Sequence, residues 1–395
     1  MMPTAVCLPD NKKLFFYSHY NMKIIWLAHE ASLSGANRCL LEYLSILKKQ
    51  GVENHLVIPY GNGELDLKAR EAGIAFEKIK FYSWAKELHA PPTRMRLKFK
   101  RWLRNYIAVK KLASCIKKTS PDYVVTNTIT TPVGAMAAKK TGVKHVWLVH
   151  EFGEEDHGFT IAGGFSKGAE IINNLSCKIV FNSLSVRRKY QSAVSDSKAF
   201  IVHNAVMVAD VVPLPLVKEG PLRLMMLGQI APAKNIMEAL QALQICRKKG
   251  LKFSLKVVGT AEDKAYLLHL KTFVHKAGMD ALINFYGAAA EPVSILQNHH
   301  ALLMCSHHEA FGRVTVEALK CGLPVIAANT GGSPEIIEKD ADGYFYEAGN
   351  AADLAEKILL LNKNYLYFDR MKIAVSAKEK YNEANTAEEL MKVFT

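Results

Sequence analysis

The sequence lacks any uninterrupted apolar run of the about 18 residues that a membrane-spanning helix needs. Its seven cysteines are scattered, odd in number and never spaced as Cys-x-x-Cys, so the spacing suggests neither a disulfide framework nor a zinc motif. A Gly-x-Gly-x-x-Gly motif is missing after the first expected strand, which disfavours a dinucleotide-binding dehydrogenase. With 49% hydrophobic and 22% charged residues, the composition excludes a disordered or collagen-like chain.

Acidic residues are scarce in one half of the chain only. The formal net charge is +14, from 51 Lys and Arg against 37 Asp and Glu. Residues 1–200 hold 30 basic and 16 acidic side chains, whereas residues 201–395 hold 21 of each. The excess therefore predicts an anionic partner for the first half: a membrane surface, a phosphorylated substrate or nucleic acid.

Short apolar runs alternate with helical periodicity from Met22 onward, which predicts an α/β fold with parallel sheets. Residues 1–21 are expected to be an unstructured leader, with Met1 or Met22 as the start. The Pro- and Gly-containing stretch 209–220 predicts a linker between an N-terminal domain, 22–208, and a C-terminal domain, 221–365. Strands are expected at 23–28, 55–59, 123–126, 145–149, 178–181, 199–202, 222–227, 255–258, 282–285 and 301–305.

Three expected strands of the second domain end at Gly228, Gly259 and Gly287. A glycine at this point lets backbone approach a ligand at the carboxyl edge of the sheet, where open α/β sheets bind their ligands. Tight strand-to-helix turns explain each single glycine equally well.

The stretch 306–326 carries the clearest chemical signal. Glu309 lies in the loop between an expected strand and an expected helix, and Glu317 lies about one turn inside that helix. The backbone N–H groups of Phe311, Gly312 and Arg313 fall at the helix start, which favours a phosphate. Two carboxylates beside an anion site suit a sugar nucleotide, since they accept hydrogen bonds from sugar and ribose hydroxyls.

Glu309 and Glu317 lie within Glu-Ala-Phe-Gly and Glu-Ala-Leu-x-x-Gly-x-Pro-Val, and this context resembles the signature of the family 4 (group 1) retaining glycosyltransferases. The resemblance implies the GT-B fold, in which two Rossmann-like domains face each other across a cleft. The first domain would take the acceptor and the second the sugar nucleotide, with residues 366–395 crossing back to the first. Further matching segments are 29–36, 150–151, 181–183, 202–206, 227–235, 257–259, 285–287 and 331–335.

The resemblance also implies a role for several residues. Glu317 would hold the ribose of a UDP- or GDP-sugar, Glu309 would lie against the transferred sugar, and His150 would lie near it. Lys234 would stabilise the diphosphate leaving group without a metal ion, so no metal or cofactor is expected. The acids at 151–156 are expected to be structural or to face the acceptor. The remaining donor-binding positions implied are Gly35, Gly228, Gln229, Gly259, Tyr286, Gly287, Phe311, Gly312 and Arg313.

One position departs from the family pattern. Gln229 stands where the family usually has Arg, and Asn235 also differs from the Gly-Arg-x-x-x-x-Lys-Gly element. Glutamine supplies neither a cation nor a bidentate guanidinium group. One negative charge of the diphosphate is therefore neutralised less well, unless Arg313 or another basic group compensates.

The segment 94–118 contains ten basic residues and no acid, with aromatic and apolar residues at helical spacing. This combination is typical of a helix on an anionic membrane, and a helix that packs its apolar stripe on the domain core is the alternative. Nucleic acid is not expected, because no recognition motif accompanies the charge. The predicted membrane-facing residues are Arg96, Lys100, Arg101, Trp102 and Arg104.

The resemblance implies a glycosyltransferase that moves a sugar, with retention, to a hydroxyl of a glycan or lipid-linked acceptor. By family analogy it would serve cell-surface polysaccharide or lipopolysaccharide assembly, in the cytoplasm at the inner face of the membrane. Two alternatives remain open. One is a nucleotide-sugar epimerase, and the other is a non-catalytic sugar-nucleotide-binding protein in which Gln229 marks the loss of catalytic function.

Overall fold

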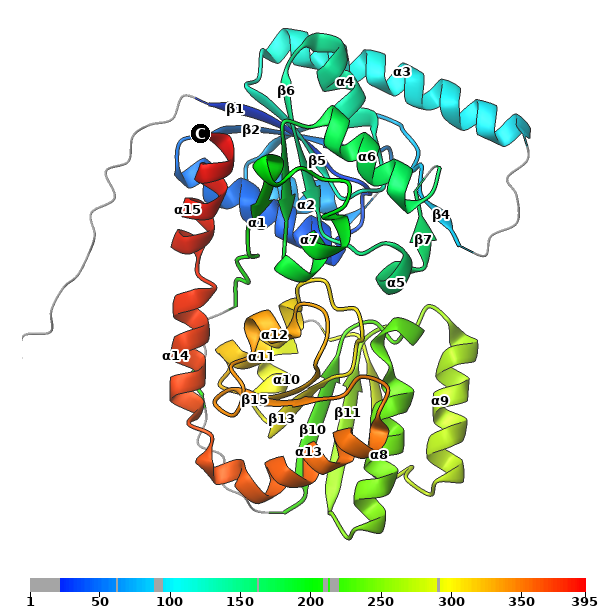
Figure 1. The fold of residues 1–395 in the computed structure, drawn as a ribbon, viewed down its shortest axis with the longest axis vertical. Coiled ribbons are helices and arrows are strands. Elements are labelled where there is room, and N and C mark those ends of the chain that lie inside the picture. Colours follow the sequence, from blue (N-terminus) through cyan, green and yellow to red (C-terminus); the bar gives the residue numbers. More distant parts are fainter. Residues whose placement is uncertain are drawn as a thin grey trace, which may run out of the picture.

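The structure is a computed structural model that describes residues 22–61, 63–88, 95–161, 163–208, 212–213, 220–289 and 292–395. It consists of two α/β domains, one above the other in Figure 1. The expected leader 1–21, Arg94 and most of the expected linker 209–220 lie outside the described residues.

The N-terminal domain is built on a seven-stranded parallel sheet in the order β3-β2-β1-β5-β6-β8-β9. Its strands are β1 (Lys23–Leu27), β2 (Glu53–Ile58), β3 (Ala75–Lys78), β5 (Tyr123–Asn127), β6 (Lys144–Val149), β8 (Lys178–Phe181) and β9 (Ala199–Ile201). Its helices are α1 (Gly35–Lys49), α2 (Glu64–Glu71), α3 (Met95–Thr119), α4 (Val133–Thr141), α5 (Glu154–His157), α6 (Phe165–Leu175) and α7 (Leu184–Tyr190). The short strands β4 (Lys86–Glu87) and β7 (Phe159–Thr160) pair antiparallel beside the sheet.

The central strands are apolar on both faces because helices cover both. In β1, Ile24 and Trp26 pack with α1, while Ile25 and Leu27 point the other way and pack with α3 and α4. This alternation follows from the two-residue period of a strand, and burial on both faces is what parallel sheets require.

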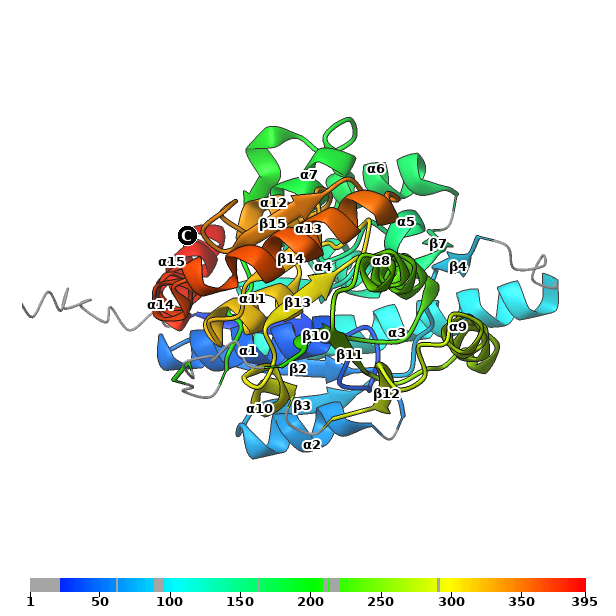
Figure 2. The same ribbon diagram turned by 90° about the horizontal axis from the view of Figure 1, so that it is seen from below.

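The C-terminal domain is built on a six-stranded parallel sheet in the order β12-β11-β10-β13-β14-β15. Its strands are β10 (Leu222–Leu227), β11 (Phe253–Val258), β12 (Ile283–Gly287), β13 (Ala301–Met304), β14 (Val325–Ala328) and β15 (Gly343–Tyr346). Its helices are α8 (Ile236–Lys248), α9 (Lys264–Lys276), α10 (Pro292–Leu296), α11 (Arg313–Lys320), α12 (Ser333–Ile336) and α13 (Ala351–Asn364). Figure 2 shows α8 and α13 on one side of this sheet and α10 and α11 on the other.

Two final helices run along one side of the molecule and touch both domains (Figure 1). Helix α14 (Arg370–Lys380) packs on the C-terminal domain, where Ile373 and Ala377 join the core around α11. Helix α15 (Glu383–Phe394) packs on the N-terminal domain through Leu390 and Val393, and the Tyr123 hydroxyl donates to the Phe394 carbonyl oxygen at 3.1 Å. The end of the chain therefore links the two domains.

The expectation of an α/β protein with two parallel sheets is confirmed, and all ten expected strands are present within one or two residues of their predicted positions. Three strands of the two sheets, β3, β14 and β15, are not among the ten. β3 and β15 are edge strands, and β3 has no buried residue, so its apolar pattern is weak. Within the described part of the chain, no helix is long and apolar enough to cross a bilayer.

Candidate functional site

The residues singled out in the sequence gather where the carboxyl edge of the C-terminal sheet faces the N-terminal domain. Gly228 follows β10, Gly259 follows β11 and Glu309 follows β13. These three strands are neighbours in the sheet, in the order β11-β10-β13. Helices α11 and α12 lie on this side of the C-terminal domain, opposite α5 and α7 (Figure 1). Open α/β sheets bind their ligands at this edge.

An ion pair between Lys234 and Glu309 lies at the centre of this edge. Lys234 ends a short 3₁₀ turn after β10, and its Nζ donates to Oε2 of Glu309 at 2.7 Å. The Glu309 side chain is 17% exposed and that of Lys234 is 35% exposed. Burial by itself would raise the pKa of Glu309, but the Lys234 ammonium outweighs it and holds this pKa below its ordinary value. Glu309 therefore stays ionised at neutral pH, beside the Lys234 side chain at the sheet edge.

A glycine pair in the next loop holds the backbone of Glu309. The Gly332 N–H donates to the Glu309 carbonyl oxygen at 2.7 Å. A Cβ atom at Gly331 would lie 2.5 Å from the same oxygen, and the residue has a φ of +60°. Only glycine allows this close crossing of two loops, so Gly331 and Gly332 fix the position of the Glu309 backbone.

Helix α11 is preceded by Gly312, which lies in the left-handed region with a φ of +93°. The first N–H groups of α11 have no partner within the helix, and this end carries the positive end of the helix dipole. Glu317 lies one turn further along and is half-buried. Burial raises the pKa of Glu317, while the nearby Arg313 guanidinium opposes that shift.

The side chain of Arg313 crosses to the N-terminal domain. Its two terminal nitrogens donate to the two carboxylate oxygens of Glu42 in α1, at 2.6 and 2.9 Å. Glu42 thus pairs with this guanidinium, and whether Arg313 supplies the charge that Gln229 lacks stays a prediction. The sequence contained no motif around Glu42 that would have indicated this contact.

The strand ends around Gly228 and Gly259 approach each other closely. A Cβ atom at Gly259 would lie 1.7 Å from the Gly228 carbonyl oxygen, which explains glycine there by packing alone. The exposed Gln229 lines a small recess together with Gly228 and Lys234. Tyr286 lies on the edge strand β12, 53% exposed, with the Lys256 ammonium 5.2 Å from its ring centre. Its place beside a ligand stays a prediction, as does that of Gly287 at the end of β12.

On the N-terminal side, His150 is held by a chain of amides. The amide nitrogen of Asn127 donates to the Ala36 carbonyl and to Oδ1 of Asn37, so its own Oδ1 accepts from His150 Nε2 at 2.7 Å. Asn37 in turn donates to two carbonyls of the loop that precedes Gly35. Burial lowers the pKa of His150 to about 3, so the ring is neutral, with its proton on Nε2 and a lone pair on Nδ1. The sequence analysis missed both asparagines, since neither lies in a recognisable motif.

The acidic stretch after His150 organises its own loop. The buried Glu151 accepts from the backbone N–H groups of Ile129 and His150, and Asp156 accepts from those of Phe152 and Gly153. These bonds support the expectation of a structural role.

The domains also meet through Glu335, at the end of the Gly-Gly-x-x-Glu segment. Its carboxylate oxygens accept from the backbone N–H groups of Leu184 and Ser185, at 2.7 and 2.8 Å. These N–H groups begin α7, where a carboxylate is favourable. Glu335 therefore anchors α12 to the N-terminal domain beside the candidate site.

The predicted basic helix is present as α3, but its two halves differ. All five predicted membrane-facing residues lie in the first half and are exposed. Of the apolar positions expected on one face, Phe99 and Trp102 are exposed, whereas Val109 and Ala113 are buried against the sheet and α4. The second half of the helix therefore packs on the domain core, and a membrane contact of the exposed first half stays a prediction.

Comparison with known proteins agrees with this architecture along nearly the whole chain. The model "Glycosyltransferase Family 4" matches residues 33–209, and the model "Glycosyl transferases group 1" matches residues 215–380. The lipopolysaccharide 1,6-galactosyltransferase of Escherichia coli (strain K12) is 24% identical over 383 residues, which cover 91% of this chain and 94% of that protein.

Solved structures show the same fold. HepE (Alr3699) of Anabaena, in complex with UDP, superposes with a TM-score of 0.76 at 18% identity, covering 94% of this chain and 99% of that one. The apo form of the lipopolysaccharide outer core galactosyltransferase WaaB superposes with a TM-score of 0.72 at 17% identity, covering 94% and 99%. The expected GT-B fold is thus confirmed, and with both of its domains matched the chain belongs to the group 1, family 4 glycosyltransferases.

Proposed function

We propose that the protein transfers a sugar from a UDP-sugar, with retention at the anomeric carbon, to a hydroxyl of a glycan or lipid-linked acceptor. The observation that carries this proposal is the Lys234–Glu309 pair, which lies beside the start of α11 with Glu317 one turn away. A cation, free helix N–H groups and two carboxylates are the groups that a diphosphate, a sugar and a ribose need.

Lys234 changes partner when the donor arrives. Its side chain forms an ion pair with Glu309 at 2.7 Å. A diphosphate carries more negative charge than one carboxylate, so it draws the ammonium away and leaves Glu309 free to accept from a sugar hydroxyl. As the glycosidic bond breaks, negative charge builds up on the leaving diphosphate, and Lys234 with the α11 N–H groups stabilises it. We therefore expect EDTA to leave the transfer rate unchanged.

His150 contributes from the opposite side of the cleft. Because its ring is neutral and its Nε2 proton is held by Asn127, its Nδ1 presents a lone pair. A neutral acceptor can bind a hydroxyl of the transferred sugar without placing a positive charge beside the cationic centre that forms at the anomeric carbon. We assign His150 this positioning role and name no nucleophile.

The choice of UDP and of a surface polysaccharide rests on the relatives. HepE binds UDP in its crystal structure, and the Escherichia coli relative is a lipopolysaccharide galactosyltransferase. One carboxylate on ribose serves UDP and GDP alike, so the base has to be found by experiment.

Donor binding is tested by calorimetric titration of wild type, Lys234→Ala and Glu317→Ala with UDP, GDP and ADP. We expect UDP to bind best, and each variant to lose about tenfold or more in affinity, since a hydrogen bond to a charged group contributes about 1.5–3 kcal/mol. Lys276→Ala and Glu356→Ala, exposed residues on α9 and α13, are the matched controls and should bind as wild type does. A wild type that binds no nucleotide while fully folded would contradict the proposal.

The reaction is tested with UDP-sugars and a lipopolysaccharide or polyprenyl-linked acceptor, with the product linkage read by NMR. Transfer with an α-linked product from an α-linked donor supports the proposal. A new free nucleotide sugar, altered at one sugar carbon without an acceptor, would identify an epimerase instead. Binding without any turnover would identify a non-catalytic protein.

We further propose that the first half of α3 binds an anionic membrane surface. At 3.6 residues per turn, Met95, Phe99, Trp102 and Tyr106 fall within about 60° of one another around the helix. They are exposed, and the Trp102 ring stacks on those of Phe99 and Tyr106 at 5.8 Å. Arg96 and four further basic residues surround this stripe, and a basic residue near an anionic leaflet contributes about 1 kcal/mol. An amphipathic helix of this kind inserts its apolar side at the headgroup level.

Co-sedimentation with vesicles tests this surface. Wild type should bind vesicles that contain phosphatidylglycerol and should not bind pure phosphatidylcholine, and salt should weaken the binding. Phe99→Ser with Trp102→Ser should abolish it, whereas Leu268→Ser, which removes an exposed leucine of α9, should have no effect. Equal binding of the double variant would show that α3 is not the membrane contact.

A further inference from the structure

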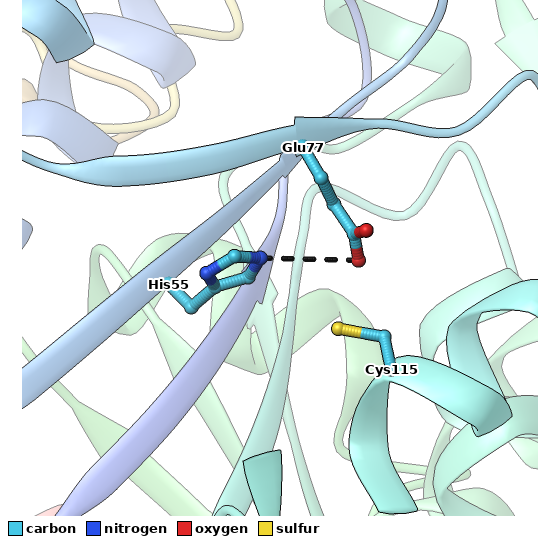
Figure 3. Close-up of side chains that lie close together, drawn as sticks. All are labelled: His55, Glu77 and Cys115. Atoms are coloured by element: carbon cyan, nitrogen blue, oxygen red, sulfur yellow. Dashed lines mark ion pairs between the residues drawn. The ribbon is translucent and has the colours of Figure 1, made fainter. Parts of the chain in front are cut away.

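Three side chains far apart in the sequence meet in the N-terminal domain, outside the candidate site. His55 comes from β2, Glu77 from the edge strand β3, and Cys115 from the buried half of α3. Figure 3 shows the imidazole, the carboxylate and the thiol pointing toward one common point. Their ligand atoms all lie within 4.8 Å of one another, and each residue is half-buried.

The polar atoms of this cluster are poorly satisfied by the protein. His55 Nε2 and Glu77 Oε1 are both shielded from solvent and have no hydrogen-bond partner among the described residues. Their nearest charged contact is each other, at 3.8 Å, which is too long for a hydrogen bond. Buried polar atoms of this kind normally have a partner, so the gap between them points to a group that fills it.

We propose that His55, Glu77 and Cys115 bind one divalent cation of the zinc class. An imidazole nitrogen, a carboxylate oxygen and a thiolate are all established zinc ligands, and three of them leave the fourth tetrahedral position for water. Zinc bonds of about 2.0–2.3 Å place neighbouring ligand atoms about 3.3–3.7 Å apart. The observed separations of at most 4.8 Å therefore close by about 1 Å through side-chain rotation.

The charges and protons of the proposed site balance. Binding releases one proton, from the Cys115 thiol, while Glu77 is already a carboxylate and His55 binds as the neutral ring through Nε2. Two negative ligands and a doubly charged cation give a neutral site, which suits a half-buried position. Because the thiol has to lose its proton to bind, zinc affinity falls as the pH is lowered.

The site would tie the buried half of α3 to the two outer strands of the sheet. Cys115 lies beside Leu112 and Ile116, which pack on the core. A metal link there fixes the direction in which the exposed basic half of the helix projects. This inference does not depend on the proposed sugar transfer, because none of the three residues belongs to the candidate site at the edge of the C-terminal sheet.

The test uses the full chain, stripped with a chelator and then supplied with Zn²⁺ or Co²⁺ alone. We expect one equivalent of tightly held zinc by elemental analysis, and a Tm raised by about 5 °C at saturation. Co²⁺ should give a thiolate-to-metal charge-transfer band in the near ultraviolet. Cys115→Ser and Glu77→Gln should each weaken zinc binding at least tenfold, and Cys115→Ser should remove the band.

Two surface variants serve as matched controls. Cys177→Ser removes an exposed cysteine and His275→Ala an exposed histidine beside Asp280, and both should bind zinc as wild type does. Glu77→Gln keeps the size of the side chain and serves if Cys115→Ser does not fold. A folded wild type that holds no zinc, or a cobalt band that persists in Cys115→Ser, would overturn the proposal.

Discussion

The bidentate pair between Arg313 and Glu42 joins α11 of one domain to α1 of the other, so its loss should weaken the contact between the domains. The two side chains are 17% and 15% exposed, and their nitrogen–oxygen distances are 2.6 and 2.9 Å. The variant Arg313→Met keeps the apolar stem and removes the guanidinium. It leaves the Glu42 carboxylate largely buried without a counter-charge, which costs about 3–5 kcal/mol for a fully buried pair. Because solvent reaches part of this pair, we expect about 2–4 kcal/mol.

The partner variant Glu42→Gln should cost less, about 1 kcal/mol, for two reasons. The amide keeps an oxygen that accepts one hydrogen bond from Arg313. Glu317 also lies close enough to interact with the Arg313 charge, so the guanidinium retains a neighbouring carboxylate. The double variant should lose less free energy of unfolding than the two single variants together, by about 1.5 kcal/mol or more.

Urea unfolding of the four proteins measures this coupling, and small-angle scattering reports whether the domains separate. Lys68→Met with Glu71→Gln is the control, because these residues form an exposed pair at 2.7 Å whose coupling should not be measurable. If the effects of Arg313→Met and Glu42→Gln add to within about 0.5 kcal/mol, the two side chains do not interact in solution and the reasoning is wrong.

Three further predictions concern the folded state. Gly259→Ala should lower the free energy of unfolding in urea by more than about 3 kcal/mol, because the added Cβ would clash with backbone. Gly250→Ala is the control: Gly250 has a positive φ but open space around it, so the loss should be about 1 kcal/mol. Equal losses would contradict this reasoning. Burial lowers the pKa of His145 to about 3, so the folded protein keeps this ring neutral while the unfolded chain takes up a proton below pH 6.5. The free energy of unfolding therefore falls as the pH drops from 6.5 toward 3. His145→Gln should reduce this fall between pH 6.5 and 5 by about 2 kcal/mol, and an unchanged slope would refute it. Leu390→Ala, at a fully buried position of α15, should cost about 3 kcal/mol, and the exposed Leu360→Ala should cost little; a silent Leu390→Ala would show that α15 does not pack on the N-terminal domain in solution.

Much of the fold follows from local pattern. Buried parallel strands read as continuous apolar runs, so ten strands could be placed from the sequence, while the edge strand β3, which has no buried residue, could not. The Glu309 loop was also predictable, because Gly312 and the helix it starts are neighbours in the chain. Local spacing determines which loops end at the sheet edge.

The partners of the site residues were decided only by the tertiary structure. Arg313 and Glu42 are 271 positions apart, and His150 reaches Asn127 on a neighbouring strand. Cys115 likewise meets His55 only because α3 packs across β2 and β3. The sequence by itself determined two parallel sheets, a family signature and a basic segment. Which charge neutralises which, which half of α3 is exposed and which side chains could share a metal depend on packing between distant segments, and short-range spacing carries no information about that packing.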